Sequence, residues 1–388
     1  MPRPFVALTL IALATSPAFA QDANPEVNGK RMLTWMQDLK SETNPRLRRV
    51  AVVSLGELAV AKRSDPMIMR GIATSIGNAL RNDATVSVRT QAVEVMGQVA
   101  AIVLEEKDND PTSVAIDLAE SLRLEKDPAV KLRVAKLLGQ FRKFGKPGVA
   151  PLTDCLTASD LALRQTAADS LGRIGDEARP ATDALLKALT DKEKGVRAAA
   201  AFALGRVDAA DVNKVALALL PLLKSDPAVE VRQEVVTTVG LLNDRTSETL
   251  TGLAVGLSDQ EAEVRRRTGL ALGRLRTAAK VVTPQLKKAI TDDPSARVRM
   301  DCLRALVAAH EENAKELLPF LTSRLDAKAE KDYAVRVAVA EELGGLGLDA
   351  VPALAALRKA QTDPQLKVRE AAGRAIKAIT KSTAPPKK

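Results

Sequence analysis

The side chains that most often carry catalysis or bind metals are scarce in this sequence. Its 388 residues include one histidine, His310, and two cysteines, Cys155 and Cys302. A typical zinc, haem or iron–sulfur site needs more nitrogen and sulfur donors than these, and a Ser-His-Asp triad would have to use His310. The pair His310-Glu311 begins like a zinc-binding H-E-x-x-H motif, but no second histidine follows. We therefore expect no catalytic residue, cofactor or metal site, and we expect His310 to be a surface residue at a helix end.

Short motifs that mark enzymes are also missing. The sequence contains no G-x-S-x-G, no C-x-x-C, no phosphate-binding loop and no dinucleotide fingerprint. These absences favour a protein that is not an enzyme.

Basic residues, in contrast, recur at regular intervals. The chain has 58 Lys and Arg against 48 Asp and Glu, a formal net charge of +10. A Val or Leu followed directly by Lys or Arg recurs ten times, with a basic spacing of about 33 residues and a few longer intervals. An acidic residue precedes the basic one by six positions in every copy except that of Ala158, and a glycine usually follows eight positions later. The ten basic residues are Arg48, Arg89, Lys131, Arg164, Arg197, Arg232, Arg265, Arg299, Arg336 and Arg369.

The spacing around each basic residue predicts a helix. After Val196, the apolar residues Ala200, Ala203 and Leu204 follow the 3.6-residue period of one helix face. The glycine eight positions after the basic residue falls near the helix end, where a residue with positive φ commonly ends a helix. A second apolar segment precedes each of these helices. The repeated unit is therefore a first helix, a short turn and a second helix that carries the basic residue.

The segments Asp191–Arg197 and Asp259–Arg265 carry the resemblance to a known family. The pattern D-P-x-x-x-V-R, with A-x-x-A-L-G following, resembles the HEAT repeats, and in particular the bilin-lyase-type (PBS-lyase) HEAT-like subclass, and these two segments are close copies of it. The resemblance covers residues 28–381. It implies an all-α fold: a right-handed α-solenoid of about ten helix-turn-helix repeats, often called an armadillo-type fold.

The resemblance also implies a structural role for the recurring charges. In HEAT repeats, acidic and basic residues form a ladder that links adjacent repeats, and the acid is also placed to cap the second helix. The ladder would use Asp83, Arg89, Asp191, Arg197, Asp226, Arg232, Asp259, Arg265, Asp293, Arg299, Asp363 and Arg369.

Partner binding is expected on the outward face of the second helices, which is commonly the concave face of a repeat protein. Positions three, six and ten residues after the aligned Val or Leu give a mainly basic strip with two apolar side chains. An alternative is a solvated face whose arginines only keep the protein soluble. The candidate partner-binding residues are Arg133, Lys136, Arg173, Phe202, Arg206, Arg267, Leu270, Arg274 and Arg304.

Two stretches of the sequence are basic and contain no acid. They are Lys131–Thr153 and Arg265–Thr291. Such clusters attract acidic partners and can hold polyanions. Aromatic side chains, which stack on single-stranded nucleic acid, number only six Phe, one Trp and one Tyr. Acidic protein, anionic glycan or an envelope polymer is therefore a better candidate partner than nucleic acid.

The chain ends have their own signatures. Residues 1–20 combine an early Arg, an apolar run and a small-x-small ending, as in a secretory signal peptide. We expect a protein that is exported to the periplasm or secreted, with no membrane span after cleavage. Residues 28–381 form the repeat solenoid, and residues 382–388 form a short, basic, disordered tail.

The two cysteines are expected to remain free thiols. Cys302 occupies a helix position that other repeats fill with Ala, Val or Thr, so it should lie in the core. Cys155 is more than four repeats away, which is too far for a disulfide.

Three functions remain open at this point. The first is a non-enzymatic scaffold that binds a protein along its second helices. The second is binding of an anionic non-protein ligand through the basic strip. The third, which only the resemblance suggests, is a bilin-lyase-like or other enzyme.

Overall fold

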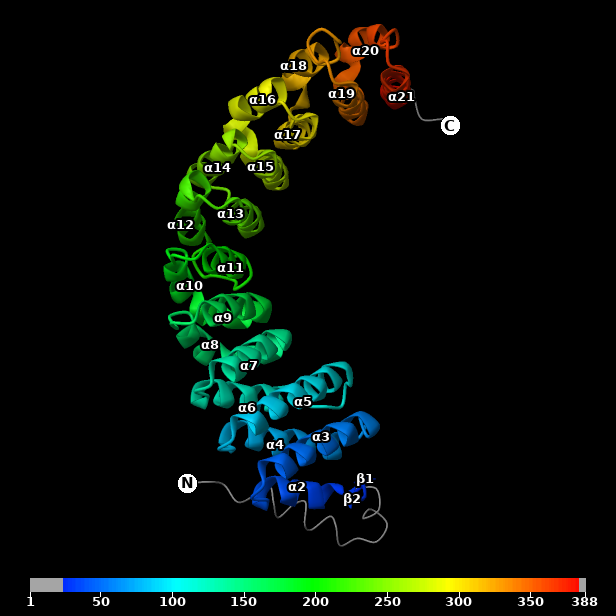
Figure 1. The fold of residues 1–388 in the computed structure, drawn as a ribbon. Helices are drawn as coiled ribbons and strands as arrows, with labels where there is room; N and C mark the ends of the chain where they lie inside the picture. The colour runs from blue at the N-terminus through cyan, green and yellow to red at the C-terminus, as the bar shows by residue number, and fades with distance from the viewer. Residues whose placement is uncertain (1–23, 384–388) are drawn as a thin grey trace. The chain divides into compact units, whose positions relative to one another are not determined.

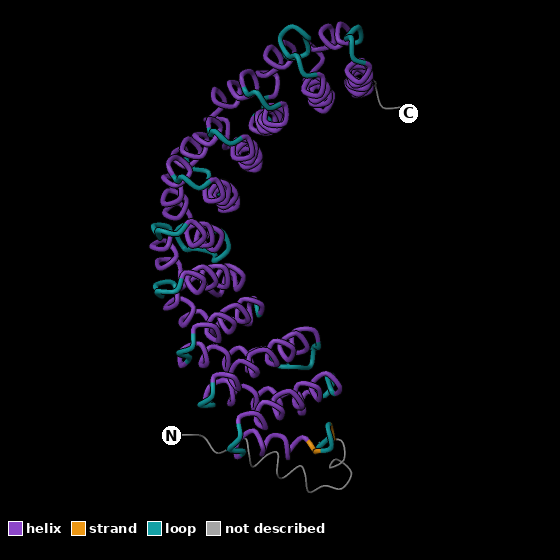
Figure 2. The backbone as a smooth tube through the Cα atoms, in the orientation of Figure 1, coloured by secondary structure: helices purple, strands orange, loops and turns teal. Residues whose placement is uncertain are grey.

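The computed structural model describes residues 24–383 and consists almost entirely of helices joined by short loops (Figures 1 and 2). The prediction of an all-α solenoid is confirmed. The predicted signal peptide lies outside the described residues, as do residues 384–388 of the predicted tail, and helix α21 ends at Thr383. The chain divides into two compact units, the first up to Ala210 and the second from Asp211.

The first unit contains five helix pairs preceded by a β-hairpin. Within it the second helices pack against one another and the first helices form the other layer (Figure 1). The second helices are α3 (Pro45–Ala61), α5 (Val86–Glu105), α7 (Pro128–Gln140), α9 (Leu161–Ile174) and α11 (Lys194–Leu204). The first helices are α2 (Met32–Ser41), α4 (Pro66–Asn82), α6 (Pro111–Leu124), α8 (Val149–Cys155) and α10 (Thr182–Ala188), with the 3-10 helices η1 (Arg142–Gly148) and η2 (Gly175–Ala181) before α8 and α10.

The second unit repeats this two-layer arrangement. Its second helices are α13 (Val229–Leu242), α15 (Ala262–Leu275), α17 (Ala296–Ala309), α19 (Tyr333–Gly345) and α21 (Leu366–Thr383). Its first helices are α12 (Val212–Ser225), α14 (Ser247–Ala254), α16 (Thr283–Asp292), α18 (Leu318–Ser323) and α20 (Leu354–Ala360), with the 3-10 helices η3 (Val255–Ser258), η4 (Arg276–Val282), η5 (Ala314–Leu317) and η6 (Gly347–Ala353).

Several helices begin at an acid or amide followed by proline. The Asp65 side chain accepts the backbone N–H groups of Met67 and Ile68 at the start of α4, and Pro66 occupies the first position of that helix. Asp127 does the same at the start of α7. The side chain satisfies amides that have no partner within the helix, and proline has no amide N–H to satisfy there.

Small apolar side chains fill the space between the two layers. On α11, Val196, Ala200, Ala203 and Leu204 are fully buried, as the helical period predicts. Alanine at these positions lets helix axes approach closely, which suits a chain with few aromatic residues.

The aligned glycines do not end the helices by positive φ, so that prediction is wrong. Gly172 lies inside α9, where a Cβ atom would come within 2.8 Å of the Cα of Ala203 on the neighbouring second helix. The glycine therefore permits close helix packing. After six of the eight aligned glycines, but not after Gly56 or Gly97, positive φ occurs three positions later instead. The residues there are Arg142, Gly175, Asp208, Asn243, Arg276 and Gly347.

An N-terminal hairpin, which we did not predict, covers the start of the first unit. Strands β1 (Glu26–Val27) and β2 (Lys30–Arg31) pair antiparallel through a turn in which Asn28 and Gly29 both have positive φ. The indole Nε1 of Trp35 donates a hydrogen bond of 2.9 Å to the carbonyl oxygen of Val27. Trp35 is thereby held under the hairpin, with only 6% of its surface exposed.

Candidate functional site

The recurring arginines bridge adjacent repeats. In the second unit, Nη1 of Arg232 donates to the backbone carbonyl of Asp226, at 2.9 Å, in its own repeat. Its Nε and Nη2 donate to the two carboxylate oxygens of Asp259 in the next repeat, at 2.7 and 2.9 Å. One planar guanidinium thus binds two successive inter-helix turns, a geometry that lysine cannot reproduce.

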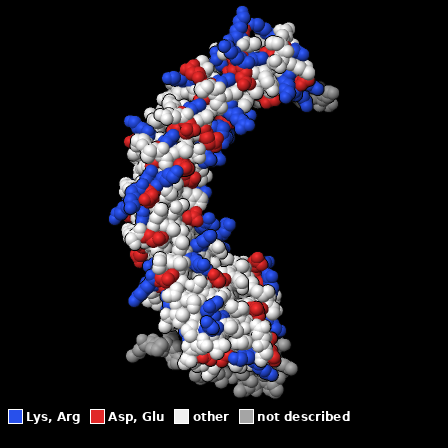
Figure 3. Space-filling view, viewed as in Figure 1, with Lys and Arg blue, Asp and Glu red and all other residues white. Residues whose placement is uncertain are grey.

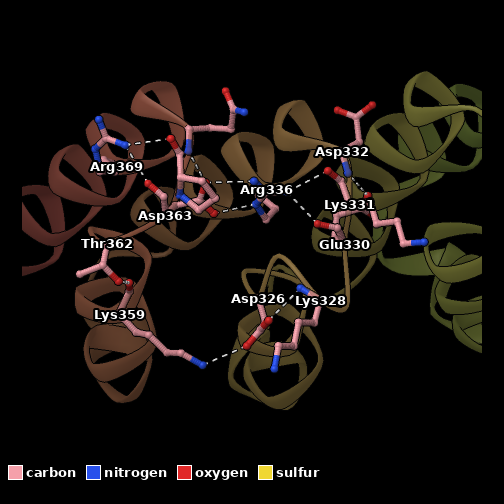
Figure 4. Close-up of polar contacts among 12 residues, drawn as sticks. Asp326, Lys328, Glu330, Lys331, Asp332, Arg336, Lys359, Thr362, Asp363 and Arg369 are labelled. Carbon is pink, nitrogen blue, oxygen red and sulfur yellow. Dashed lines mark hydrogen bonds and ion pairs between the residues drawn. The ribbon is translucent and has the colours of Figure 1, made fainter.

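The same arrangement recurs along both units, and Figure 4 shows it around Arg336. There the guanidinium lies between the Asp363 carboxylate, at 2.8 and 3.0 Å, and the carbonyls of Glu330 and Lys331. Arg232 and Arg336 thus pair with the acid of the following repeat and not with the carboxylate six positions before them. The other pairs of this kind are Arg48–Asp83, Arg89–Glu125, Arg164–Asp191, Arg265–Asp293 and Arg299–Glu330.

The ladder acids stabilise the inter-helix turn without being the N-cap. Oδ1 of Asp259 accepts the backbone N–H of Glu261 at 2.9 Å, and Glu261 is the N-cap residue of α15. The acid therefore lies two residues before the cap, which corrects the expectation that it caps the second helix directly. Asp191 and Asp363 bind the N–H groups of Glu193 and Gln365 in the same way.

Two residues, Lys131 and Ala158, depart from the ladder pattern, and they lie in successive repeats. If they followed the pairing of the other repeats, they would be partners. Lys131 replaces arginine in one repeat, and Ala158 replaces the acid of the next repeat. Both halves of one ladder pair have thus changed. At the C-terminal end, Arg369 binds the carbonyls of Asp363 and Pro364, at 2.8 and 3.1 Å, and no later repeat follows it among the described residues.

The ladder geometry lowers carboxyl pKa values. Hydrogen bonding from Arg164 lowers the pKa of Asp191 below its ordinary value, against a smaller opposing effect of burial. For Asp363, burial acts to raise the pKa, but the hydrogen bonds from Arg336 and from the Gln365 amide outweigh it. Arg336 is only 2% exposed. These charges are internal and satisfied, so they are poorly placed to bind an external ligand.

In the first unit, the outward face of the second helices carries five of the predicted partner-binding residues. Arg133 on α7 pairs with Glu94 on α5, and both side chains are about half exposed. Arg173 pairs with Asp169 on the same helix at 2.7 Å.

The other three predicted residues of this unit differ in the contacts that their side chains make. The guanidinium of Arg206 stacks over the ring of Phe202 at 3.6 Å, and its Nη1 also donates to the Phe202 carbonyl. Lys136 is exposed and makes no ion pair with any residue in 24–383.

In the second unit, the predicted residues belong largely to a network of charges. Arg267 binds Glu263 at 3.0 Å, and Arg304 binds Asp301 at 3.2 Å. Hydrogen bonds from Arg266, and then from Arg267, lower the pKa of Glu263 to about 2. Leu270 and Arg274 are exposed on α15 between these pairs.

The basic stretch Arg265–Thr291 has acidic partners from outside the stretch. Within the second unit, Arg276 pairs with Glu311 and Lys280 with Glu316. Arg265, Arg266 and Arg267 also bind acids, as described above. Figure 3 shows acidic and basic side chains interspersed on the visible face of each unit. A stretch of sequence that carries only positive charges therefore does not form a surface that carries only positive charges.

Comparison with known proteins places this architecture in a family. The model for HEAT repeats matches residues 115–205, 182–254, 216–307 and 283–377. The chain belongs to the HEAT-repeat family. Among curated proteins, none matches the sequence.

Two solved structures share this fold at low sequence identity. A crystal structure of an engineered protein is 18% identical with a TM-score of 0.54, and the match covers 90% of this chain and 98% of that one. A chain of the structure that describes Kap95p binding to RanGDP is 15% identical with a TM-score of 0.57. That match covers 97% of this chain and 54% of the other chain.

The first two helix pairs add a feature that our candidate residues omitted. The second helices α3 and α5 form a groove of about 540 Å³, lined by Val53, Gly56, Glu57, Val60, Ala61, Gln91, Val95 and Gln98. The rule of three, six and ten positions, applied to these repeats, gives Val50, Val53, Glu57, Gln91, Glu94 and Gln98. The helical phase that places Arg133 and Leu270 on the outward face therefore also places Val53 and Gln98 there.

His310 is buried in the HEAT core, so its prediction as a surface residue is wrong. It is 4% exposed, with Nδ1 lying 3.0 Å from the Leu306 carbonyl oxygen and Nε2 lying 3.3 Å from the Thr283 hydroxyl. The side chain turns back along α17 and fills the end of the helix pair. Its hydrogen bonds give it a structural role.

The remaining candidates for chemistry are also internal. Cys155 and Cys302 are free and buried, and burial raises the pKa of the Cys302 thiol to about 12. Within residues 24–383, no group of three or more His, Cys, Asp or Glu side chains is placed to hold a metal ion. Among the helices described, none combines the length and the apolar character that a membrane span requires.

Proposed function

We propose that this protein is a non-enzymatic HEAT-repeat scaffold that binds a protein partner along the outward face of its second helices. The observation that carries the proposal is the composition of that face. It exposes the apolar side chains of Val53 and Val60 on α3 and of Leu270 on α15, and it also exposes arginines such as Arg133 and Arg267, each of which binds one acid. Exposed apolar groups next to arginine are typical of protein-binding surfaces.

The comparisons support binding of proteins over catalysis. A chain of similar fold comes from a structure of Kap95p binding to RanGDP. Because identity is only 15%, the similarity concerns the fold, and the partner of this chain is not implied by it.

We also propose that the chain is exported, on the basis of residues 1–20, and that its repeats belong to the PBS-lyase-like subclass, on the basis of segments such as Asp191–Arg197.

The alternative, binding of an anionic glycan or envelope polymer, has less support. Most arginines of the predicted basic strip already contact an acid, and the arginines of the ladder are internal. Affinity for a polyanion would fall steeply with salt, about in proportion to the number of phosphate-like charges neutralised. A protein partner held partly by apolar contact would show a shallower salt dependence.

Affinity capture tests the proposal. The bait is the chain from residue 21 onward, incubated with an extract of the exported fraction of the source cell. It is compared with a variant in which Arg133, Arg173, Arg206, Arg267 and Arg274 are changed to Glu. A protein retained by the unmodified chain and lost by the variant supports the proposal. Equal recovery by both would contradict it.

A further inference from the structure

We propose that the groove between α3 and α5 binds an apolar segment of the protein partner, and that this segment carries acidic residues on the side that faces α7. This inference rests on the proposed function and specifies the chemistry of the partner. Its evidence is the lining of the groove, the charge at either side of it and the spacing of the helices around it.

The groove offers apolar walls and amide groups together. Val53, Val60 and Val95 line it, and so do Gln91 and Gln98, whose side chains carry amide groups. Apolar walls favour aliphatic side chains, and the amides can bind the polar backbone of the same segment. A peptide can satisfy both requirements at once, whereas a glycan has no aliphatic side chains to bury.

Gly56 allows α3 and α5 to pack closely at the base of the groove. A Cβ atom on Gly56 would come within 2.7 Å of Cγ1 of Val95, so α3 and α5 meet there in direct contact. Val50 and Val60, at 46% and 56% exposed, extend the apolar surface along α3 from either end. Single exposed valines are ordinary, but a row of them beside a groove is typical of a docking surface.

The hairpin makes one side of the groove acidic. Asn28, in the β-turn, donates hydrogen bonds to Oε2 of Glu57 at 2.7 Å and to the hydroxyl of Ser54 at 3.0 Å. The Glu57 carboxylate is thereby held at the groove through Oε2, one of its two oxygens. Acidic groups of a partner are repelled at this position.

Beyond α5 the same face carries a net positive charge, because Arg133 and Arg173 are each balanced by one acid and Lys136 adds a further cation. Glu94 is paired with Arg133, and Lys136 makes no ion pair among the described residues. Arg173 follows on α9 with one carboxylate partner. A segment that lies across the second helices would therefore find apolar contacts between α3 and α5 and positive charge from α7 onward.

Helices α5 and α7 pack less closely than other second helices, at a point between the groove and Arg133. At most aligned glycines an added Cβ would press against the next second helix, as at Gly56 and Gly139, but at Gly97 no atom lies within 4 Å. The face of α5 that would pack against α7 is therefore open at this level. It leaves space on the path from the groove to Arg133.

Synthetic peptides provide the probes for a direct test. We would measure fluorescence polarisation of labelled peptides with the chain from residue 21 onward. One peptide joins a leucine- and valine-rich block to an aspartate-rich block, in either order. A second replaces the aspartates by lysines, and a third replaces the apolar block by glycine and serine. We expect the apolar-acidic peptide, in its better order, to bind about tenfold or more tightly than the other two.

Paired variants separate the groove from the basic area. Changing Val53 and Val60 to Asp should weaken the apolar-acidic peptide about tenfold, and changing Lys136 and Arg173 to Glu should do the same. These side chains are exposed, so circular dichroism should show the fold retained. The matched controls are Val281→Asp for the apolar change and Arg123→Glu with Lys187→Glu for the charges, all exposed in the first-helix layer.

The outcomes distinguish this inference from the proposed function. If the charge variant weakens binding and the groove variant does not, the groove inference fails and the second-helix face stands. If neither variant changes binding, or the lysine peptide binds as well as the acidic one, the inference fails and the proposed face loses its support. Self-association in analytical ultracentrifugation that is abolished by Val53→Asp would show that a second copy fills the groove, which would also overturn the inference.

Discussion

At the scale of the residue, one guanidinium group joins two repeats. Arg336 binds two backbone carbonyls of its own turn and the carboxylate of Asp363 in the next turn. Both side chains are 3% exposed. A charge buried in this way is stabilising only while its partner is present, because desolvation of an unpaired ion costs several kcal/mol.

The first prediction concerns this pair. Changing Asp363 to Asn should lower the free energy of unfolding of the second unit by about 3 kcal/mol, because it leaves the Arg336 charge buried and poorly paired. Urea denaturation followed by circular dichroism measures the loss. The control is Glu94→Gln, which breaks the half-exposed pair with Arg133 and should change the midpoint little. Equal effects of the two changes would contradict a structural role for the ladder.

The second prediction concerns pH. Ladder carboxyls such as Asp191 and Asp363 have pKa values below their ordinary values in the folded chain. Their contribution to stability is therefore complete above the ordinary carboxyl pKa of about 4, and it is lost as pH falls through the lowered folded pKa. Thermal unfolding between neutral pH and about pH 3 should show Tm falling below about pH 4. A Tm that rises or stays constant over this acidic range would count against the ladder.

At the scale of the element, glycines in equivalent positions differ in what surrounds them. Gly172 faces the backbone of Ala203 and the ring of Phe202, each at 2.8 Å from an added Cβ, whereas Gly97 faces open space. Both lie inside helices, so backbone conformation is not the difference. The contact made by the neighbouring helix determines what glycine does there.

The third prediction uses this contrast. Gly172→Ala should destabilise the first unit by about 1–3 kcal/mol, because α9 and α11 would have to separate. Gly97→Ala should stabilise it by about 0.5–1 kcal/mol, because alanine is the better helix former and meets no neighbour. Denaturation midpoints of the two variants give the test. A loss of stability from Gly97→Ala would show that α5 and α7 pack more closely than described.

Sequence periodicity predicted the elements better than their contacts. The recurring Val-Arg and acidic residues gave the helix pairs and the polar residues of each turn, because these patterns are local. It could not show that Arg232 prefers the carboxylate of Asp259 over that of Asp226, since the choice depends on how repeats stack. For His310 the sequence showed a charged neighbourhood, but the direction in which the side chain turns decides its burial.

The candidate surface was predictable in part. The rule for outward positions found Arg133, Lys136 and Leu270, because outward directions follow from helical phase. The rule could not show that Arg267 already binds Glu263 or that Arg206 stacks on Phe202. The hairpin at Asn28-Gly29 has a recognisable turn signal, but it occurs once and is not part of the recurring helix-turn-helix pattern.

At the scale of the whole molecule, the net positive charge is less informative than its pairing. The formal charge of +10 suggests a polyanion-binding protein, yet basic residues in both units find acids from neighbouring repeats. What remains exposed on the second helices is a mixture of apolar and charged groups, as the proposed scaffold requires.

The most direct test of this scaffold role is photo-crosslinking with the captured partner, using a photoreactive amino acid placed at single positions. Lys136 and Leu270 report on the second-helix face, and Arg123 and Leu348 report on the first-helix layer; all four are exposed. Our account predicts crosslinks to one protein from Lys136 and Leu270 and none from the other two positions. Crosslinks mainly from Arg123 or Leu348 would contradict it.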